Sequence, residues 1–141
     1  MRARLEHANI AVRDPEAVAA FLTTAFPHYR VRRRGRKENG DAWLHVGCDD
    51  DYVSLEEAPD AATPVRALYG PAPGINHLAW EVDDLEALRA RLLDAGYTES
   101  TVPNDHPHRR RVYFLDPTGL DWEFVQYLSN EPSERHDYEL A

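Results

Sequence analysis

The sequence is poor in cysteine, in long apolar runs and in positive charge. Its single cysteine, Cys48, excludes an intrachain disulfide and a cysteine-based zinc site. No segment approaches the ~18–20 apolar residues of a membrane helix, and the first residues, MRARLEHANI, contain no apolar signal segment. We therefore expect a cytoplasmic protein that does not enter a membrane, with Cys48 as a buried or half-buried structural thiol.

The charge balance excludes another class of partner. Sixteen Lys and Arg against 25 Asp and Glu give a net charge of −9, whereas nucleic-acid binding needs a surplus of basic side chains. Two basic clusters remain, Arg30–Lys37 and Arg109–Arg111. We interpret them as solvated strand edges and a loop; the alternative is that one of them meets an anionic group of a substrate.

Several common catalytic motifs are also missing. The sequence has no GxGxxG or GxxxxGK[ST] phosphate loop, no HExxH helix, no GxSxG elbow, and no serine or cysteine nucleophile with a paired base. The composition, 43% apolar and 29% charged residues, is nevertheless that of a globular protein.

An internal repeat is the most informative feature that is present. A shift of 70 residues aligns LEHANIAVRDPEAVAAFLTTAF, from Leu5, with INHLAWEVDDLEALRARLLDAG, from Ile75, and eight of the 22 positions are identical. His7 and His77 form one of these identical pairs, and Asp14 and Asp84 form another. The chain is therefore predicted to be a duplicated module.

Each copy has the same pattern of secondary structure. Alternating apolar residues predict a strand, Asp14 and Asp84 suit helix N-caps, and the periodicity predicts helices over 15–26 and 85–95. Further strands are predicted at about 28–34, 41–47, 51–57, 97–102, 110–115 and 120–128.

The predicted fold class is α+β, with two tandem βαβββ modules that pair into a curved, half-open eight-stranded barrel around a cleft. We predict one domain with module 1 at about 4–58, a linker rich in Ala, Pro and Gly at 59–73, module 2 at 74–128, and a polar tail at 129–141.

LEHANIAV, INHLAWEV and YFLDPTGLDWEFVQY resemble the first- and last-strand signatures of the vicinal oxygen chelate superfamily, over roughly residues 4–128. This group includes glyoxalases, extradiol dioxygenases, epimerases, and fosfomycin and bleomycin resistance proteins. The resemblance implies a divalent metal, one of Fe, Mn, Zn, Ni or Co, with His7, His77 and Glu123 as ligands. Two imidazoles and a carboxylate leave coordination sites open for two neighbouring substrate oxygens.

The fourth ligand position departs from the glyoxalase pattern. Aligning the last strands of the two copies places Ser54 where a glutamate is expected, with Glu56 two residues further on as a weaker candidate ligand. Without that glutamate, the set looks more like that of the dioxygenases. Tyr113 resembles their substrate-binding tyrosine, and His45 is the nearest candidate for their catalytic histidine.

The resulting prediction is a metal-dependent enzyme acting on a small molecule, with dioxygenase-like chemistry slightly favoured over lyase or isomerase chemistry. The alternative is a metal-free antibiotic-binding protein of the bleomycin-resistance type. For that alternative, Trp43, Tyr52, Trp80 and Trp122 are either ligand-gripping or packing residues. A homodimer is expected from the resemblance. The two remaining loop histidines, His106 and His108, are expected at the surface.

Overall fold

A computed structural model describes residues 3–58, 62 and 64–139, so that residues 1–2, 59–61 and 63 (the last four in the predicted linker) and 140–141 lie outside the described residues. The chain divides into two compact units, Met1–Val65 and Arg66–Ala141, and each is considered by itself. No helix in the described part of the chain is long and apolar enough to cross a membrane.

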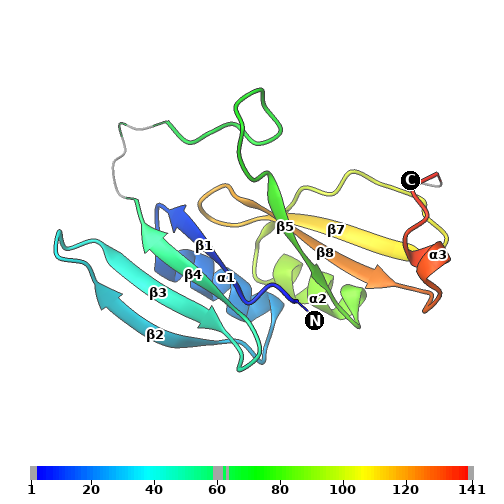
Figure 1. Cartoon of the computed structure of the whole chain (residues 1–141), viewed down its shortest axis with the longest axis horizontal. Helices are drawn as coiled ribbons and strands as arrows, with labels where there is room; N and C mark the ends of the chain where they lie inside the picture. The colour runs from blue at the N-terminus through cyan, green and yellow to red at the C-terminus, as the bar shows by residue number, and fades with distance from the viewer. Residues whose placement is uncertain (1–2, 59–61, 63, 140–141) are drawn as a thin grey trace. The chain divides into compact units, whose positions relative to one another are not determined.

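The first unit is a βαβββ module (Figure 1). Its elements are β1 (His7–Val12), α1 (Pro15–Ala25), β2 (Arg30–Arg36), β3 (Ala42–Gly47) and β4 (Tyr52–Glu57). The strands form one open sheet in the order β1-β4-β3-β2, with β1 parallel to β4 and the other pairs antiparallel.

The second unit repeats this order. Its elements are β5 (His77–Glu81), α2 (Leu85–Asp94), β6 (Thr98–Glu99), β7 (Arg109–Leu115), β8 (Asp121–Tyr127) and the short α3 (Pro132–Arg135). The sheet order is β5-β8-β7-β6, and β5 is again parallel to β8. The α+β prediction and the two βαβββ modules are therefore confirmed.

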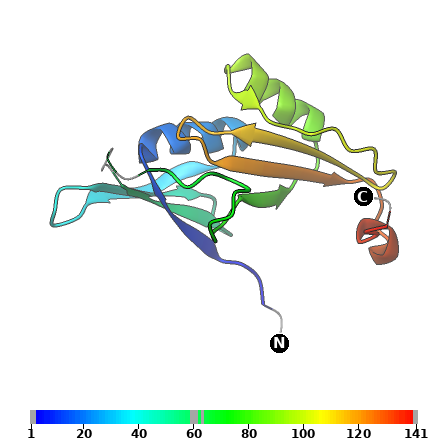
Figure 2. The same ribbon diagram turned by 90° about the horizontal axis from the view of Figure 1, so that it is seen from above.

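The two helices begin as the sequence predicts. The side chains of Asp14 and Asp84 each accept a hydrogen bond from the backbone N–H three residues on, at 3.0 and 2.9 Å, and act as N-caps. Each helix covers one face of its own sheet, which Figure 2 shows from above. The cores between helix and sheet contain fully buried side chains such as Phe21 and Leu22 in the first unit and Leu88 and Phe124 in the second.

Two of three local predictions need adjustment, those of one strand and of His106, whereas that of Cys48 agrees with the structure. The strand predicted at 97–102 is only Thr98–Glu99, because past Glu99 the Tyr113 N–H of β7 donates to the Thr101 hydroxyl instead of to a backbone carbonyl. Cys48 is half-buried, as expected, with its thiol 3.5 Å from an Asp51 carboxylate oxygen. His106 is not at the surface: it is 6% exposed, and its Nε2 lies 3.0 Å from the Asp137 carbonyl oxygen of the C-terminal segment.

Strand alternation decides which side chains are free for chemistry. On β8, Trp122 and Phe124 belong to the core beneath α2. Because neighbouring residues of a strand point to opposite faces, Asp121 and Glu123 emerge on the other face of the same sheet. This helix-free face of the second unit contains the candidate site.

Candidate functional site

His77 and Glu123 meet on the helix-free face of the second unit. His77 is the first residue of β5, and it lies opposite Asp121 in the parallel ladder, with Glu123 two residues further along β8. The imidazole Nε2 is 2.9 Å from a carboxylate oxygen of Glu123. Glu123 is only 8% exposed, so its charge needs a partner. The structure thus brings together two of the three predicted ligands.

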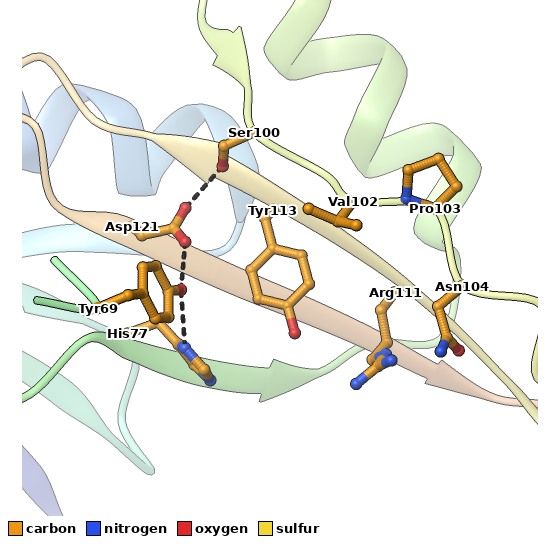
Figure 3. A pocket seen from close by; sticks show the side chains of 9 residues that line it. All are labelled: Tyr69, His77, Ser100, Val102, Pro103, Asn104, Arg111, Tyr113 and Asp121. Atoms are coloured by element: carbon orange, nitrogen blue, oxygen red, sulfur yellow. Dashed lines mark hydrogen bonds between the residues drawn. The ribbon is translucent and has the colours of Figure 1, made fainter. Parts of the chain in front are cut away.

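The other nitrogen of His77 is engaged by a residue that the sequence did not indicate. The hydroxyl of Tyr69 lies 3.1 Å from His77 Nδ1 and donates its hydrogen to Asp121, whose carboxylate oxygen is 2.6 Å away. The Ser100 hydroxyl donates to the second oxygen of Asp121 at 2.7 Å. Figure 3 shows this chain of hydrogen bonds from Ser100 through Asp121 and Tyr69 to His77.

These hydrogen bonds determine where His77 carries its proton. Since the Tyr69 hydroxyl donates its hydrogen to Asp121, its oxygen is left to accept a hydrogen bond from an N–H at His77 Nδ1. The Nε2 of a neutral imidazole then presents a lone pair to the carboxylate of Glu123. Two facing electron pairs at 2.9 Å need a proton or a cation between them.

This donor set fits a divalent metal. An imidazole held by a hydrogen bond at its far nitrogen is the usual arrangement of a metal-ligating histidine. Two donors at right angles, each about 2.1 Å from one ion, are about 3.0 Å apart, close to the observed separation of Nε2 and the carboxylate oxygen. Among the described residues, however, no group of three or more His, Cys, Asp or Glu is assembled for a metal. The second unit by itself supplies a pair.

Tyr69 is held in place by its loop. Its backbone has a φ of 57°, in the left-handed region that side chains other than glycine rarely adopt. Its N–H donates to the Asn76 side-chain oxygen at 2.9 Å, and Arg66 donates to the same oxygen and to the carbonyls of Ala72 and Ile75. The loop before β5 therefore presents the Tyr69 side chain to His77.

Tyr113 lies beside the His77–Glu123 pair. It is opposite Glu123 in the antiparallel β7–β8 ladder, close enough for that carboxylate to raise its pKa. Its ring meets the His77 ring edge-on, with centroids 5.6 Å apart. Burial, followed by the interaction with the Glu123 carboxylate, raises the pKa of Tyr113 to about 12, so the phenol stays protonated around neutral pH.

The Asp-Pro-Thr-Gly turn aligns Tyr113 with Glu123. One carboxylate oxygen of Asp116 accepts from the N–H and hydroxyl of Thr118, both at 2.7 Å, and from the N–H of Leu120 at 3.2 Å. The other oxygen accepts from the Trp122 indole at 2.9 Å. Gly119 has a φ of 87°, which suits glycine. The turn thereby sets the register of the hairpin that carries the two site residues.

A pocket of about 320 Å³ opens beside these groups. Its lining comprises Tyr69, His77, Ser100, Val102, Pro103, Asn104, Arg111, Tyr113 and Asp121 (Figure 3). All of them belong to the second unit. The volume suits a small molecule, and most of the polar groups of the lining are the hydrogen-bonded residues described above.

His7, the third predicted ligand, lies in the first unit. It is the first residue of β1, as His77 is of β5, and it lies opposite Tyr52, whose ring it stacks on at a centroid distance of 4.9 Å. Its Nδ1 contacts the Glu6 carboxylate. That His7 joins His77 and Glu123 at one metal stays a prediction.

The strand register supports the match between Ser54 and Glu123. Ser54 lies opposite Asn9 on β1, and Glu123 lies opposite Ala79 on β5, a shift of 70 residues in the first strand. Ser54 is buried and accepts a hydrogen bond from the Asn9 amide at 3.1 Å. The residue opposite Ser54 on β3 is His45, where the second unit has Tyr113.

Glu56, the weaker candidate ligand, already has partners. Its two carboxylate oxygens bind Lys37 Nζ at 2.5 Å and the Asn9 amide at 3.0 Å. The hydrogen bond from Lys37, followed by that from Asn9, lowers the pKa of Glu56. This carboxylate therefore has no need of a metal to balance its charge.

Three site residues were missed by the sequence analysis, namely Tyr69, Ser100 and Asp121. Tyr69 lies in a Pro- and Gly-rich segment without periodicity, and no sequence signal could have placed it against His77. Asp121 had a weak signal, since it is a carboxylate at the start of an otherwise apolar strand, two residues before Glu123 on the same face.

Comparison with known proteins identifies the family. The sequence profile of the Glyoxalase/Bleomycin resistance protein/Dioxygenase superfamily matches residues 4–124, most of the chain. The chain belongs to this superfamily. The resemblance noted in the first- and last-strand signatures is thereby confirmed.

One relative of this chain is named as an epimerase. This chain is 30% identical over 130 residues to the ethylmalonyl-CoA/methylmalonyl-CoA epimerase of Cereibacter sphaeroides. The aligned region covers 89% of this chain and 97% of the relative. Similar solved structures include a glyoxylase/bleomycin resistance protein/dioxygenase domain from Frankia sp. EAN1pec, with a TM-score of 0.74 and 20% identity over 97% of this chain and 100% of that one. Another is the fosfomycin resistance protein FosX of Listeria monocytogenes, complexed with Mn(II) and sulfate, with a TM-score of 0.65 and 16% identity over 97% and 100% of the two chains. These two structures support the fold.

Proposed function

We propose that this glyoxalase superfamily chain is a divalent-metal-dependent enzyme that binds a small substrate through two neighbouring oxygens. The observation that carries the proposal is the His77–Glu123 pair, in which Nε2 faces a carboxylate oxygen at 2.9 Å while Nδ1 is committed to Tyr69. His7 would be the third ligand, with Fe, Mn, Zn, Ni or Co as the candidate metals. When bound, such a metal polarises a substrate oxygen and stabilises negative charge on it.

The reaction type that we favour is proton transfer next to a carbonyl group. The comparisons name dioxygenases only as one part of the whole superfamily, whereas the relative that shares 30% identity is an epimerase. The site offers a matching group in Tyr113, a phenol that stays protonated beside the metal-binding pair and can donate a hydrogen bond to a developing oxyanion. Isomerase or lyase chemistry therefore replaces dioxygenation as the first hypothesis.

An epimerase that uses two bases needs a second basic group, and the alignment of the two modules places no carboxylate at the position that matches Glu123. Ser54 lies where a second carboxylate is expected, and a serine hydroxyl is a poor base without a partner. His45 faces Ser54 across the β3–β4 ladder, and burial, followed by the charge of Arg32, lowers its pKa, which keeps the imidazole neutral and able to accept a proton. His45 remains a candidate base.

The antibiotic-binding alternative has less support. Trp122 is 1% exposed and packs on Trp80 at a centroid distance of 5.4 Å, so it belongs to the core. Arg32 already covers the Tyr52 ring at 4.6 Å, the position that a cationic ligand would take. We keep this alternative only as an outcome of the test.

The test measures metal content and exchange together. Purified protein should contain about one divalent metal per chain by elemental analysis, and it should exchange the proton next to the carbonyl of ethylmalonyl-CoA or methylmalonyl-CoA for deuterium in D₂O. His77→Ala and Glu123→Gln should lose both properties. Glu56→Gln is the matched control. Glu56 lies on the last strand of module 1 and is already bound by Lys37 and Asn9, so its replacement should leave metal content and exchange unchanged.

Three results would contradict the proposal. One is full metal retention in His77→Ala. Another is metal loss from Glu56→Gln as large as that from Glu123→Gln. The third is a chelator-treated protein with unchanged melting temperature and unchanged ligand binding, which would favour the metal-free binding protein.

A further inference from the structure

The three arginines of the β7 cluster have different environments. Arg109 is 8% exposed and donates toward the Arg135 carbonyl at 3.5 Å. Arg110 lies near the Glu86 carboxylate on α2, at 4.0 Å. Arg111 lines the pocket beside Tyr113 (Figure 3).

Arg111 is half-buried and has no carboxylate counter-ion among the described residues, unlike its neighbour Arg110 on the same strand. In residues 3–58, 62 and 64–139 it forms no ion pair with a carboxylate, although the chain contains 25 acidic residues. The acidic groups nearest in the site are already engaged, Asp121 by Tyr69 and Ser100, and Glu123 by His77. An uncompensated guanidinium in a pocket is a binding group for an anion.

The neighbouring groups suit an oxyanion. Arg111 and Tyr113 are two residues apart on one strand, so their side chains point to the same face with Cα atoms roughly 6–7 Å apart. In Figure 3 the Arg111 guanidinium, the Asn104 amide and the Tyr113 hydroxyl all extend to the same side of β7. The charge of Arg111 also acts to lower the pKa of Tyr113 against the dominant effects of burial and Glu123, which is consistent with their proximity.

From this arrangement we infer that Arg111, assisted by Asn104, forms an anion subsite that selects substrates with a carboxylate next to the oxygens bound at His77 and Glu123. The planar guanidinium can make two parallel hydrogen bonds to a carboxylate, which a neutral amide or ester cannot match. The positive charge also offsets the repulsion that Asp121 and Glu123 exert on an incoming anion. The inference rests on the proposed function, because the oxygens next to the carboxylate would bind the metal held by His77 and Glu123. Binding of the carboxylate by Arg111 needs no metal.

The test is a titration of metal-free protein with malonate, followed by ¹H–¹⁵N chemical shifts that include the Arg111 Nε–H. Malonate should bind and shift this signal, and Arg111→Ala should weaken binding at least about tenfold, the loss expected for a charge-assisted hydrogen bond. Arg111→Lys, which keeps the charge without the planar fork, should fall between the two. Arg110→Ala is the matched control and should bind within about twofold of the wild type.

Additional ligands test which chemical group the subsite recognises, and a melting temperature tests whether the Arg111→Ala substitution disturbs the fold. Neutral malonamide should bind far more weakly than malonate, and inorganic phosphate should bind less well than malonate. Equal malonate affinity in the wild type and Arg111→Ala, equal affinity for malonamide, or a preference for phosphate would overturn the carboxylate subsite. A melting temperature of Arg111→Ala near that of the wild type shows that the loss is local. Because no metal is present, failure here leaves the metal-binding proposal standing, and metal loss from His77→Ala leaves the subsite standing.

Discussion

The Tyr69 hydroxyl joins His77 to Asp121: its oxygen lies 3.1 Å from His77 Nδ1, and its hydrogen goes to an Asp121 oxygen 2.6 Å away. The contact spans the loop before β5 and the start of β8. Burial, followed by the hydrogen bond to Asp121, raises the pKa of Tyr69, so the hydroxyl keeps the hydrogen that this arrangement requires. A residue outside the strands thus sets which nitrogen of His77 faces Glu123.

Replacing Tyr69 by phenylalanine should weaken metal binding. Without the hydroxyl, His77 Nδ1 loses its acceptor, and the ring is no longer held with Nε2 toward Glu123. Loss of such a supporting hydrogen bond typically costs about 10- to 100-fold in metal affinity. Competition with a fluorescent chelator measures this. Tyr138→Phe, at a tyrosine that is 75% exposed, serves as the control, and an equal affinity in Tyr69→Phe and wild type would refute the orienting role.

Replacing Tyr113 by phenylalanine should remove a pH-dependent part of the stability at alkaline pH. The folded pKa of Tyr113 is raised to about 12 from an ordinary value of 10.0. The unfolded state therefore loses this proton first, so the contribution is fully present below about pH 10 and is lost as the pH rises through about 12.

Unfolding free energies from urea titrations between pH 8 and 12 provide the measurement. The wild type should be more stable than Tyr113→Phe by about 1–2 kcal/mol near pH 8, because the variant removes the only hydroxyl of this side chain beside the buried Glu123 carboxylate. The difference should shrink above pH 10. A difference that stays constant up to pH 12 would mean that Tyr113 titrates like an ordinary tyrosine.

Replacing Asp116 by alanine should destabilise the second unit. Its carboxylate accepts four hydrogen bonds, and its removal leaves the Trp122 indole N–H buried without an acceptor. We expect a loss of about 2–4 kcal/mol in the free energy of unfolding, measured by urea denaturation. Asp105→Ala, at an exposed aspartate in the loop before β7, should change it by less than about 0.5 kcal/mol. Similar effects of the two substitutions would show that the turn is not held by Asp116.

Local chemistry made much of the fold predictable. The N-caps Asp14 and Asp84, the apolar periodicity of the helices and the 70-residue repeat are properties of neighbouring residues, and the helices begin at Pro15 and Leu85 as predicted. The short β6 was overestimated, because whether an extended segment pairs depends on its neighbour β7 rather than on its own residues. His106 was misplaced for a similar reason, since its burial comes from a segment about 30 residues away.

The sequence alone determined which residues are repeated, and hence that His7 and His77 begin matching strands and that Ser54 corresponds to Glu123. Only the tertiary structure decided which partners complete the second-unit site: Tyr69 from the loop, Asp121 and Ser100 behind it, and Arg111 without a counter-ion in the pocket. The physical reason is that periodicity and capping act over a few residues along the chain. A hydrogen bond such as that of Tyr69 with Asp121 joins residues 52 positions apart, and only the folded sheet brings them together.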